Sequence, residues 1–247
     1  MKILYKVLNE SMRSPYQDFK YEIGKKYHCK DFDTDKSIDC SIGFYATDIE
    51  GIIYSFKKGY KVFKCKVWGK EIEIDEFKRR YENIELIDEV SYDFIKNEAK
   101  KIENKLGYKL SEALFPINPF EIKNKLTKND ISLLKQWASV WYSVVSVRAS
   151  VRDSVWDSVW DSVWVYVRAS VGSYVWDSVY GSVLDSVWAY YSSLFPNIKK
   201  WKYIKHEDSV NPFQPAIDLW HRGFVASYDG KTWGLYSGKK IVYKEKL

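Results

Sequence analysis

Residues 153–164 read Asp153-Ser154-Val155-Trp156-Asp157-Ser158-Val159-Trp160-Asp161-Ser162-Val163-Trp164. The same four-residue unit recurs between Trp137 and Trp188, with a Ser-Val pair followed by two variable positions. The residue after Val is Trp, Arg, Gly, Tyr or Leu, and these side chains share no chemistry. We therefore expect the Ser-Val pair to be what the structure requires and the variable positions to be exposed.

An α-helix would separate these two sets of positions. It advances about 100° per residue, so each Val and its preceding Ser lie on one side and the variable positions on the other. Successive Val residues drift by about 40°, which carries the stripe from Val147 to Val187 once around the helix. One straight helix cannot bury such a stripe against a flat partner. We therefore expect shorter helices, with breaks at Gly172-Ser173 and Gly181.

A β-solenoid is the alternative for the repeat. Val and Trp favour strands, whereas Ser and Asp are poor helix formers. In a strand, however, adjacent Ser and Val face opposite sides, so only frequent corners would keep both positions fixed. The flanks favour helices, because Thr127-Lys128-Asn129-Asp130 resembles a capping box and Pro196 is a natural stop. We expect a helical bundle or hairpin and leave the solenoid open.

The composition indicates a globular protein. The chain has 247 residues, of which 46% are hydrophobic and 17% aromatic, enough to bury a core. It has no signal-peptide pattern and no apolar run of about eighteen residues, so we expect no membrane partner. Three cysteines argue against a disulfide framework and favour a reducing cytoplasm. His28-Cys29 lacks the spacing of a structural zinc site, so we expect no metal and no cofactor.

The expected fold class is α+β, with four parts. Residues 1–90 form an α+β head domain, with strands at Ile3–Leu8, Tyr60–Trp68 and Ile84–Val90 and a short helix at Asp48–Phe56. Residues 91–128 form a helical connector, in which a helix at Tyr92–Leu106 ends at Gly107. Residues 129–195 are the repeat region, and residues 196–247 form a small β-rich unit.

The net charge of +6 lies outside the repeat, above all in the tail, where lysines alternate with tryptophans and tyrosines. Basic and aromatic side chains together can hold a nucleic-acid backbone and stack on its bases. A small lysine-rich domain with an aromatic core is the stronger interpretation.

Certain short motifs resemble those of known proteins. The head resembles an uncharacterised domain of phage and prophage proteins through Tyr5-Lys6, Tyr21-Glu22-x-Gly24-Lys25-x-Tyr27, Cys40-x-x-Gly43-Phe44 and Val67-x-Gly69. That family commonly reads Gly-Phe-His-x-Cys where this chain has Gly43-Phe44-Tyr45-Ala46-Thr47, so the His and the second Cys are missing. The repeat and tail resemble hypothetical proteins of gut phages and their hosts through Pro212-Phe213-Gln214-Pro215, Asp218-Leu219-Trp220 and Asp229-Gly230-Lys231-Thr232-Trp233. This resemblance implies a phage-type protein in the cytoplasm of a bacterial host.

The order of elements in the head is also similar to that of ADP-ribosyltransferase-like folds. Those enzymes clamp a nicotinamide dinucleotide with a His or Arg after the first strand and use a late Glu to direct attack on the ribose. In this chain, Lys6 stands at the position of that His or Arg, and Glu71 or Glu73 stands at the position of the late Glu. The resemblance implies a nucleotide site made of Tyr5, Lys6, Gly43, Tyr45, Thr47, Glu71 and Glu73.

The leading hypothesis is a phage-type interaction or assembly protein whose repeat scaffold presents a variable Trp/Arg/Asp surface to a protein partner or to a second copy. Exposed Trp and Arg dominate interface energetics. A nucleotide- or nucleic-acid-binding protein, or a degenerate ADP-ribosyltransferase-like enzyme, is the alternative, and no catalytic residue is assigned. The expected binding residues are Trp156, Trp160, Trp164, Arg148 and Arg152 on the repeat and Lys199, Lys200 and Lys202 on the tail.

Overall fold

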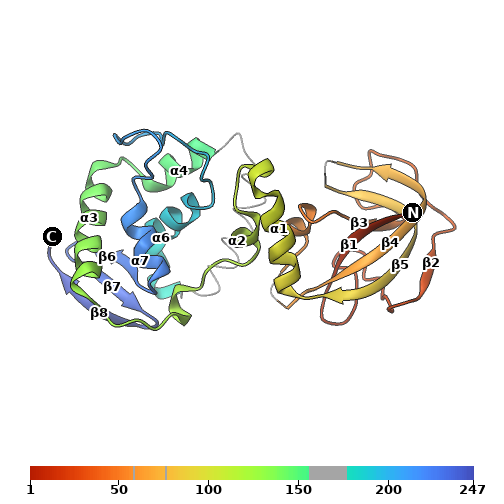
Figure 1. The fold of residues 1–247 in the computed structure, drawn as a ribbon, viewed down its shortest axis with the longest axis horizontal. Helices are drawn as coiled ribbons and strands as arrows, with labels where there is room; N and C mark the ends of the chain where they lie inside the picture. Colours follow the sequence, from red (N-terminus) through yellow and green to blue (C-terminus); the bar gives the residue numbers. More distant parts are fainter. Residues whose placement is uncertain (58, 76, 156–176) are drawn as a thin grey trace. The chain divides into compact units, whose positions relative to one another are not determined.

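The computed structural model describes residues 1–57, 59–75, 77–155 and 177–247 (Figure 1). It contains both helices and antiparallel sheets, which confirms the α+β class. The chain divides into two compact units, Met1–Ile102 and Glu103–Leu247, called unit 1 and unit 2 below. The finer division into four parts stays a prediction.

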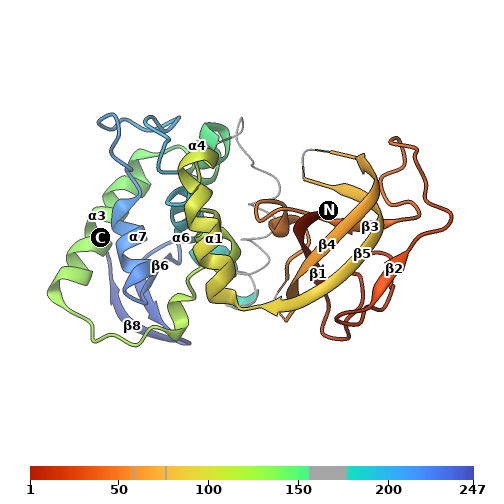
Figure 2. The same ribbon diagram turned by 45° about the vertical axis from the view of Figure 1, so that its right-hand side comes forward.

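Unit 1 is built on one curved sheet. Its strands are β1 (Lys2–Leu8), β2 (Lys26–His28), β3 (Phe44–Ala46), β4 (Lys61–Glu73) and β5 (Arg79–Val90). The order is β1-β4-β5-β2, and β3 also pairs with β5. The long strands β4 and β5 curve strongly (Figure 2), and the irregularities in their register after Lys64 and Trp68 allow this bend.

The hydrogen bonding of this sheet closes into a ring. Thr47, directly after β3, exchanges two backbone hydrogen bonds with Tyr5 of β1, at 2.7 and 2.9 Å. The pairing therefore runs from β1 through β4, β5 and β3 back to β1, which makes a small barrel. The three predicted strands are confirmed, whereas the three-residue strands β2 and β3 were missed because they carry too little alternation to detect.

Alternation along β1 places a lysine on the core side of the sheet. Leu4, Lys6 and Leu8 share one face of the strand. Leu8 is fully buried, Leu4 packs against the same core, and Lys6 is only 4% exposed. The barrel core therefore includes an ammonium group.

One helical segment lies between β3 and β4, and a second begins after β5 and extends beyond the end of unit 1. The predicted helix at Asp48–Phe56 is a single 3₁₀ turn, η1 (Gly51–Tyr54), and the predicted helix α1 (Tyr92–Leu106) has the expected bounds. Ile95 and Ala99 are buried on α1. Gly107 has a φ of 76°, a conformation that favours glycine and ends the helix as predicted.

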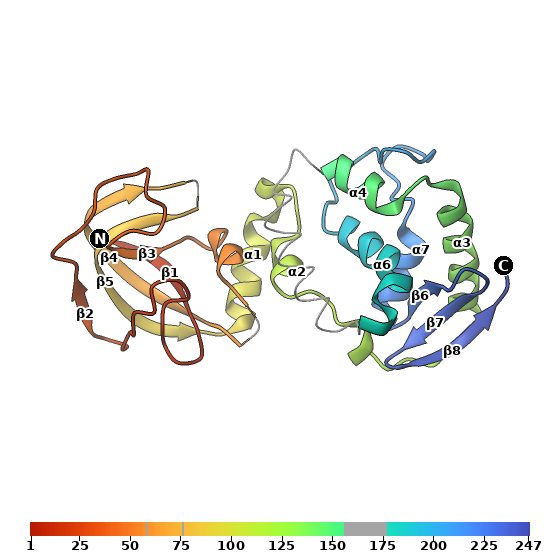
Figure 3. The ribbon, with the colours of Figure 1, turned by 180° about the vertical axis from the view of Figure 1, so that it is seen from behind.

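Unit 2 combines helices with a three-stranded sheet. Its elements are α2 (Leu110–Leu114), η2 (Pro119–Glu121), α3 (Lys128–Ser143), α4 (Val147–Val155), α6 (Asp177–Ser192), α7 (Gln214–His221), β6 (Val225–Tyr228), β7 (Trp233–Ser237) and β8 (Lys240–Glu245). The strand order is β6-β7-β8. Helix α6 contacts α4, α7 and β6 (Figure 3). The last part of the repeat therefore shares its core with the tail.

The predicted capping box starts α3. Thr127 and Asp130 satisfy each other's backbone N–H groups, and Asp130 is fully buried. Its carboxylate also pairs with Arg222, which follows α7. One acidic residue therefore caps a helix and ties it to the tail.

The described part of the repeat is helical in α4 and α6. Val147, Val151 and Val155 on α4 are buried, as are Val183 and Val187 on α6. Of the described serines before these valines, Ser150 and Ser186 are buried, whereas Ser146 and Ser154 are half-buried. The valines therefore face inward in these segments, and the architecture of the whole repeat stays a prediction. The variable position is not always exposed, because Trp188 is 2% exposed and belongs to the core.

The expected helix break at Gly181 is wrong, because Gly181 lies inside α6. An interior glycine costs a helix about 1 kcal/mol, and packing of the helix outweighs such a cost. The chain breaks instead between Ser143 and Val147, where α3 ends and α4 begins. The other expected break, Gly172-Ser173, lies outside the described residues.

Candidate functional site

A cavity of about 330 Å³ opens in unit 1. It is lined from β1, β3, η1, the turn between β4 and β5, and two loops. The lining residues used below are Tyr5, Lys6, Asp39, Cys40, Tyr45, Thr47, Tyr54, Phe77 and Lys78. Four of the predicted nucleotide-site residues, Tyr5, Lys6, Tyr45 and Thr47, meet here because ring closure brings β1 against β3.

Lys6 supplies a buried charge to the wall of this cavity. Its Nζ donates a hydrogen bond to the Tyr45 carbonyl oxygen at 2.7 Å and lies 5.1 Å from the centre of the Tyr21 ring. Among the described residues, no carboxylate lies within ion-pair distance of this ammonium. Burial lowers the pKa of Lys6 to about 8, since water no longer stabilises the charged form.

Lys78 supplies a second cation. Its Nζ lies 2.6 Å from Asp39 Oδ1, 3.1 Å from Cys40 Sγ and 5.1 Å from the centre of the Tyr45 ring. Burial is the largest single influence and acts to lower the pKa of Lys78, but the hydrogen bonds and charges of Asp39 and Cys40 together outweigh it, so the pKa lies above its ordinary value. Lys78 is therefore charged and already paired, unlike Lys6.

Arg80 ties the loop before β3 to Tyr45 on that strand. It is fully buried, donates to the Tyr45 hydroxyl at 2.9 Å and to the Asp33 carbonyl at 2.8 Å, and also reaches the carbonyls of Asp35 and Ile38. A guanidinium has the planar set of donors that this arrangement needs. The loop is therefore held rigidly at the edge of the cavity.

Gly43 makes room for this arginine. Its φ is 151°, and a Cβ there would lie 2.6 Å from Arg80 Cγ. Gly43 does not line the cavity itself. Its role is to leave space for the Arg80 side chain. Arg80 was missed from the sequence because its partners are backbone carbonyls far along the chain.

Aromatic rings form another part of the cavity wall. The rings of Tyr54 and Phe77 stack with centroids 4.9 Å apart and planes 25° from parallel. Thr47 Oγ1 donates to the Phe77 carbonyl at 2.8 Å. The turn that carries Phe77 is thereby held against β3, and the stacked pair gives the cavity an aromatic wall.

The two acidic residues of the predicted nucleotide site lie elsewhere. Glu71 accepts hydrogen bonds from Lys2 Nζ at 2.6 Å and from the Tyr81 hydroxyl at 3.2 Å. The hydrogen bond from Lys2 lowers the pKa of Glu71. Glu73 has a carboxylate oxygen 3.9 Å from Arg79 Nε. Neither carboxylate lines the cavity.

Known proteins give no guide to this cavity. No protein family, curated protein or solved structure matches the chain. Within residues 1–57, 59–75, 77–155 and 177–247, no group of three or more His, Cys, Asp and Glu residues is arranged to hold a metal ion. None of the helices described is long and apolar enough to cross a membrane. Function must therefore be argued from the geometry.

The predicted binding residues of the repeat are only partly placed. Arg148 is exposed, with its guanidinium carbon 5.9 Å from the centre of the Trp188 ring. Arg152 Nε donates to Asp153 Oδ1 at 2.7 Å. The predicted residues Trp156, Trp160 and Trp164 lie outside the described residues.

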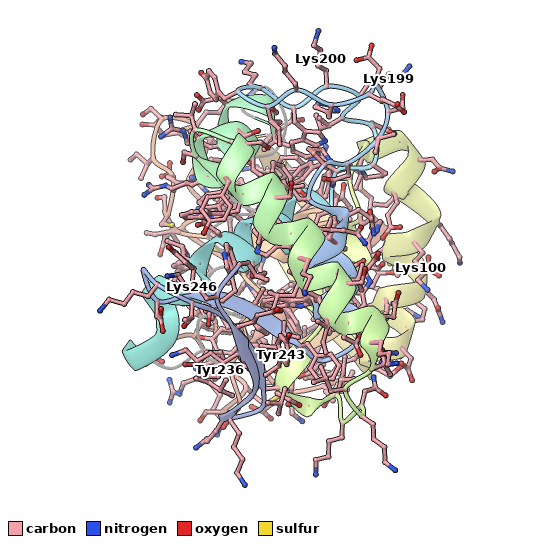
Figure 4. The ribbon with its side chains drawn as sticks, turned by 90° about the vertical axis from the view of Figure 1, so that its left-hand side faces the viewer. Lys100, Lys199, Lys200, Tyr236, Tyr243 and Lys246 are labelled. Atoms are coloured by element: carbon pink, nitrogen blue, oxygen red, sulfur yellow. The ribbon has the colours of Figure 1, made fainter. Side chains whose placement is uncertain are left out.

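The basic and aromatic residues of the tail do not form one surface. Lys199, Lys200 and Lys202 are exposed. Figure 4 shows Lys199 and Lys200 on a loop well separated from Tyr236 and Tyr243, which lie on the small sheet. The indoles of Trp201, Trp220 and Trp233 are buried and are not open to stack on bases.

Proposed function

We propose that unit 1 binds a small anionic ligand that carries a flat ring, of which a nucleotide is the best example. Lys6 carries the argument. A buried ammonium without a carboxylate partner among the described residues has lost its hydration, and a bound anion would restore a favourable interaction. The nucleotide alternative is therefore preferred for this unit.

The size and lining of the cavity support the same proposal. Small-molecule sites are mostly about 300–1,000 Å³ in volume, with aromatic walls and a few polar groups, and the cavity of about 330 Å³ falls at the lower end of this range. Tyr54 and Phe77 offer a stacking surface for a base. Lys6 offers a cation for a phosphate, whereas Lys78 is already paired with Asp39.

Binding is proposed here without a transfer reaction. A transferase of the expected kind needs its Glu beside the bound ribose. Glu71 and Glu73 are instead engaged with Lys2, Tyr81 and Arg79 and lie outside the cavity wall.

Calorimetric titration of the full-length protein with ATP, ADP and AMP, and with uncharged adenosine, tests this proposal. The phosphorylated ligands should bind more tightly than adenosine, and Lys6→Met should weaken their binding by about tenfold or more. Lys70→Met, an exposed lysine of unit 1 that does not line the cavity, should change nothing. Equal affinity of Lys6→Met and the unaltered protein, or no binding of any nucleotide, would remove the proposal.

For unit 2 we propose the repeat-based role, a phage-type interaction or assembly scaffold. The supporting observation is the division of α4, where Val147, Ser150 and Val151 are buried while Arg148 is exposed. The variable face would then bind a second copy or a protein partner. Replacing Trp156, Trp160 and Trp164 by Ser should preserve folding, seen by circular dichroism, and abolish self-association, seen by native mass spectrometry. Unfolding of this variant would show that the rings are core.

A further inference from the structure

A second, smaller cavity of about 110 Å³ lies in unit 2. Trp137 and Trp141 of α3, Asp185 of α6, Tyr228 of β6 and Trp233 of β7 line it. Three of these rings, Trp141, Tyr228 and Trp233, are called the aromatic cage below. Neither proposed function uses this cavity.

The rings of the aromatic cage meet at angles. Trp141 and Trp233 are nearly perpendicular, at 83°, with centroids 5.5 Å apart. Trp141 and Tyr228 are 5.2 Å apart and inclined at 50°, and Tyr228 and Trp233 are 5.1 Å apart and inclined at 33°. Rings from three different elements therefore contact one another at an angle, and together they line one wall of the cavity instead of forming a single stack.

A carboxylate completes the wall of this space. Asp185 Oδ2 accepts a hydrogen bond from Trp141 Nε1 at 2.6 Å. Within the described part of the chain, Asp185 has no lysine, arginine or histidine within ion-pair distance. Asp185 is half-buried, a carboxylate withdrawn from water normally pairs with a cation, and here the hydrogen-bond partner is a neutral indole.

We propose that the aromatic cage and Asp185 bind a small alkylammonium group, either quaternary or methylated. The negative faces of Trp and Tyr rings attract such cations, and cages of this kind suit ammonium groups whose methyl groups leave few or no hydrogen-bond donors. Asp185 supplies the opposite charge. Trp233 Nε1, which is buried without an acceptor among the described residues, makes no competing demand on the carboxylate.

The volume limits the ligand to one head group. The cavity of about 110 Å³ has about a third of the volume of the cavity in unit 1, so it suits a single compact head group such as a methylated ammonium. It is too small for the nucleotide proposed for unit 1. The two sites therefore differ in both the charge and the size of their ligands.

The test uses the full-length protein and tetramethylammonium chloride as the probe, followed by indole N–H shifts in two-dimensional NMR. Tetramethylammonium and choline should shift the Trp141 and Trp233 signals with saturation, whereas 3,3-dimethylbutan-1-ol, the neutral isostere of choline, should bind about tenfold more weakly or not at all. Sodium chloride at equal ionic strength is the salt control. Binding of the neutral isostere as tight as that of choline would overturn the proposal, as would no saturable shift by tetramethylammonium.

Two variants separate the carboxylate from the fold. Asp185→Asn keeps an acceptor for Trp141 Nε1 and should weaken tetramethylammonium binding by about tenfold. Asp208→Asn, an exposed acid in unit 2 that does not line the cavity, should not change it. Unchanged binding in Asp185→Asn would overturn the ionic part of the proposal.

The source of the ammonium group is decided by competition. Choline stands for a free small molecule, and a short peptide with one trimethyl-lysine stands for a modified protein. Tighter binding of the peptide than of choline assigns the cage to a methylated side chain, and the reverse assigns it to a free metabolite. Failure of both to displace tetramethylammonium would overturn the site as a ligand-binding cage.

Discussion

Ser186 Oγ donates a hydrogen bond to the Ala226 carbonyl oxygen at 2.8 Å, and both residues are buried. This bond joins a serine of the repeat on α6 to strand β6 of the tail. Ser150, a serine before Val in α4, is equally buried, but its hydroxyl has no partner within the residues described. The serine of the repeat therefore forms a hydrogen bond to the tail in α6 but has no side-chain partner among the described residues in α4.

Ser186→Ala should lower the free energy of unfolding of unit 2 by about 1 kcal/mol, because it removes a buried hydrogen bond. Ser150→Ala should have no cost or a small gain, since it removes a buried hydroxyl without a partner. Urea unfolding of the two variants measures the difference. Equal losses for both would show that the Ser186 bond does not stabilise the fold.

The pKa of Lys6 makes the stability of unit 1 depend on pH. The pKa is lowered from 10.5 to about 8 on folding, so between these values the folded protein binds fewer protons than the unfolded chain. Stability contributed by this group therefore rises from pH 8 to 10.5. Below pH 8 the full cost of the buried charge applies, about 3 kcal/mol for 2.5 pKa units.

Lys6→Met should remove this cost, so the variant should be more stable than the unaltered protein at pH 7. The difference should shrink as the pH approaches 10.5. Urea unfolding followed on NMR signals of unit 1 gives both values, with Lys70→Met as the control. A difference that stays constant across this range would mean that Lys6 does not titrate as a buried group.

Asp185 has the opposite kind of pH dependence in unit 2. Burial raises its pKa above 3.8, although the hydrogen bond from Trp141 opposes the rise. The folded protein then binds more protons than the unfolded chain above pH 3.8, so stability falls as the pH rises through that window. Asp185→Asn should be more stable than the unaltered protein at pH 7 and lose this advantage at acidic pH. Thermal denaturation over a pH series would contradict the assignment if the two curves stayed parallel.

Arg80 and Gly43 should behave as a coupled pair. Arg80→Ala should cost about 3 kcal/mol, because it removes a fully buried guanidinium together with its hydrogen bonds to the Tyr45 hydroxyl and to the loop carbonyls. Gly43→Ala should also destabilise unit 1, since its Cβ would meet the Arg80 side chain. Gly24→Ala is the matched control, with a φ of 78° and open space around it. Gly24→Ala therefore introduces the strain of a positive φ without any steric contact from the new Cβ.

Thermal denaturation of the double variant tests the coupling. The cost of Gly43→Ala should be smaller when Arg80 is already Ala, because the Cγ and Cδ atoms that the new Cβ would meet are then absent. Full additivity of the two losses would mean that Gly43 serves another purpose than making room for Arg80.

Local signals were sufficient for most of the secondary structure. The helix Tyr92–Leu106 with its stop at Gly107, the capping box at Thr127 and the inward side of the described valines all depend on residues within one or two turns. The prediction of a break at Gly181 was wrong because it also used only local information. The helix propensity of one glycine does not include the tertiary packing that stabilises α6.

The sequence by itself determined the α+β class and the inward side of the valines on α4 and at the end of α6, because periodicity and caps act over a few residues. Only the tertiary structure decided which side chains share a site. Ring closure between Tyr5 and Thr47 sets Lys6 beside Tyr45. Packing within unit 2 sets Asp185 against Trp141. Strand register and helix docking depend on contacts between residues that are far apart in the chain, and local sequence patterns do not predict these contacts.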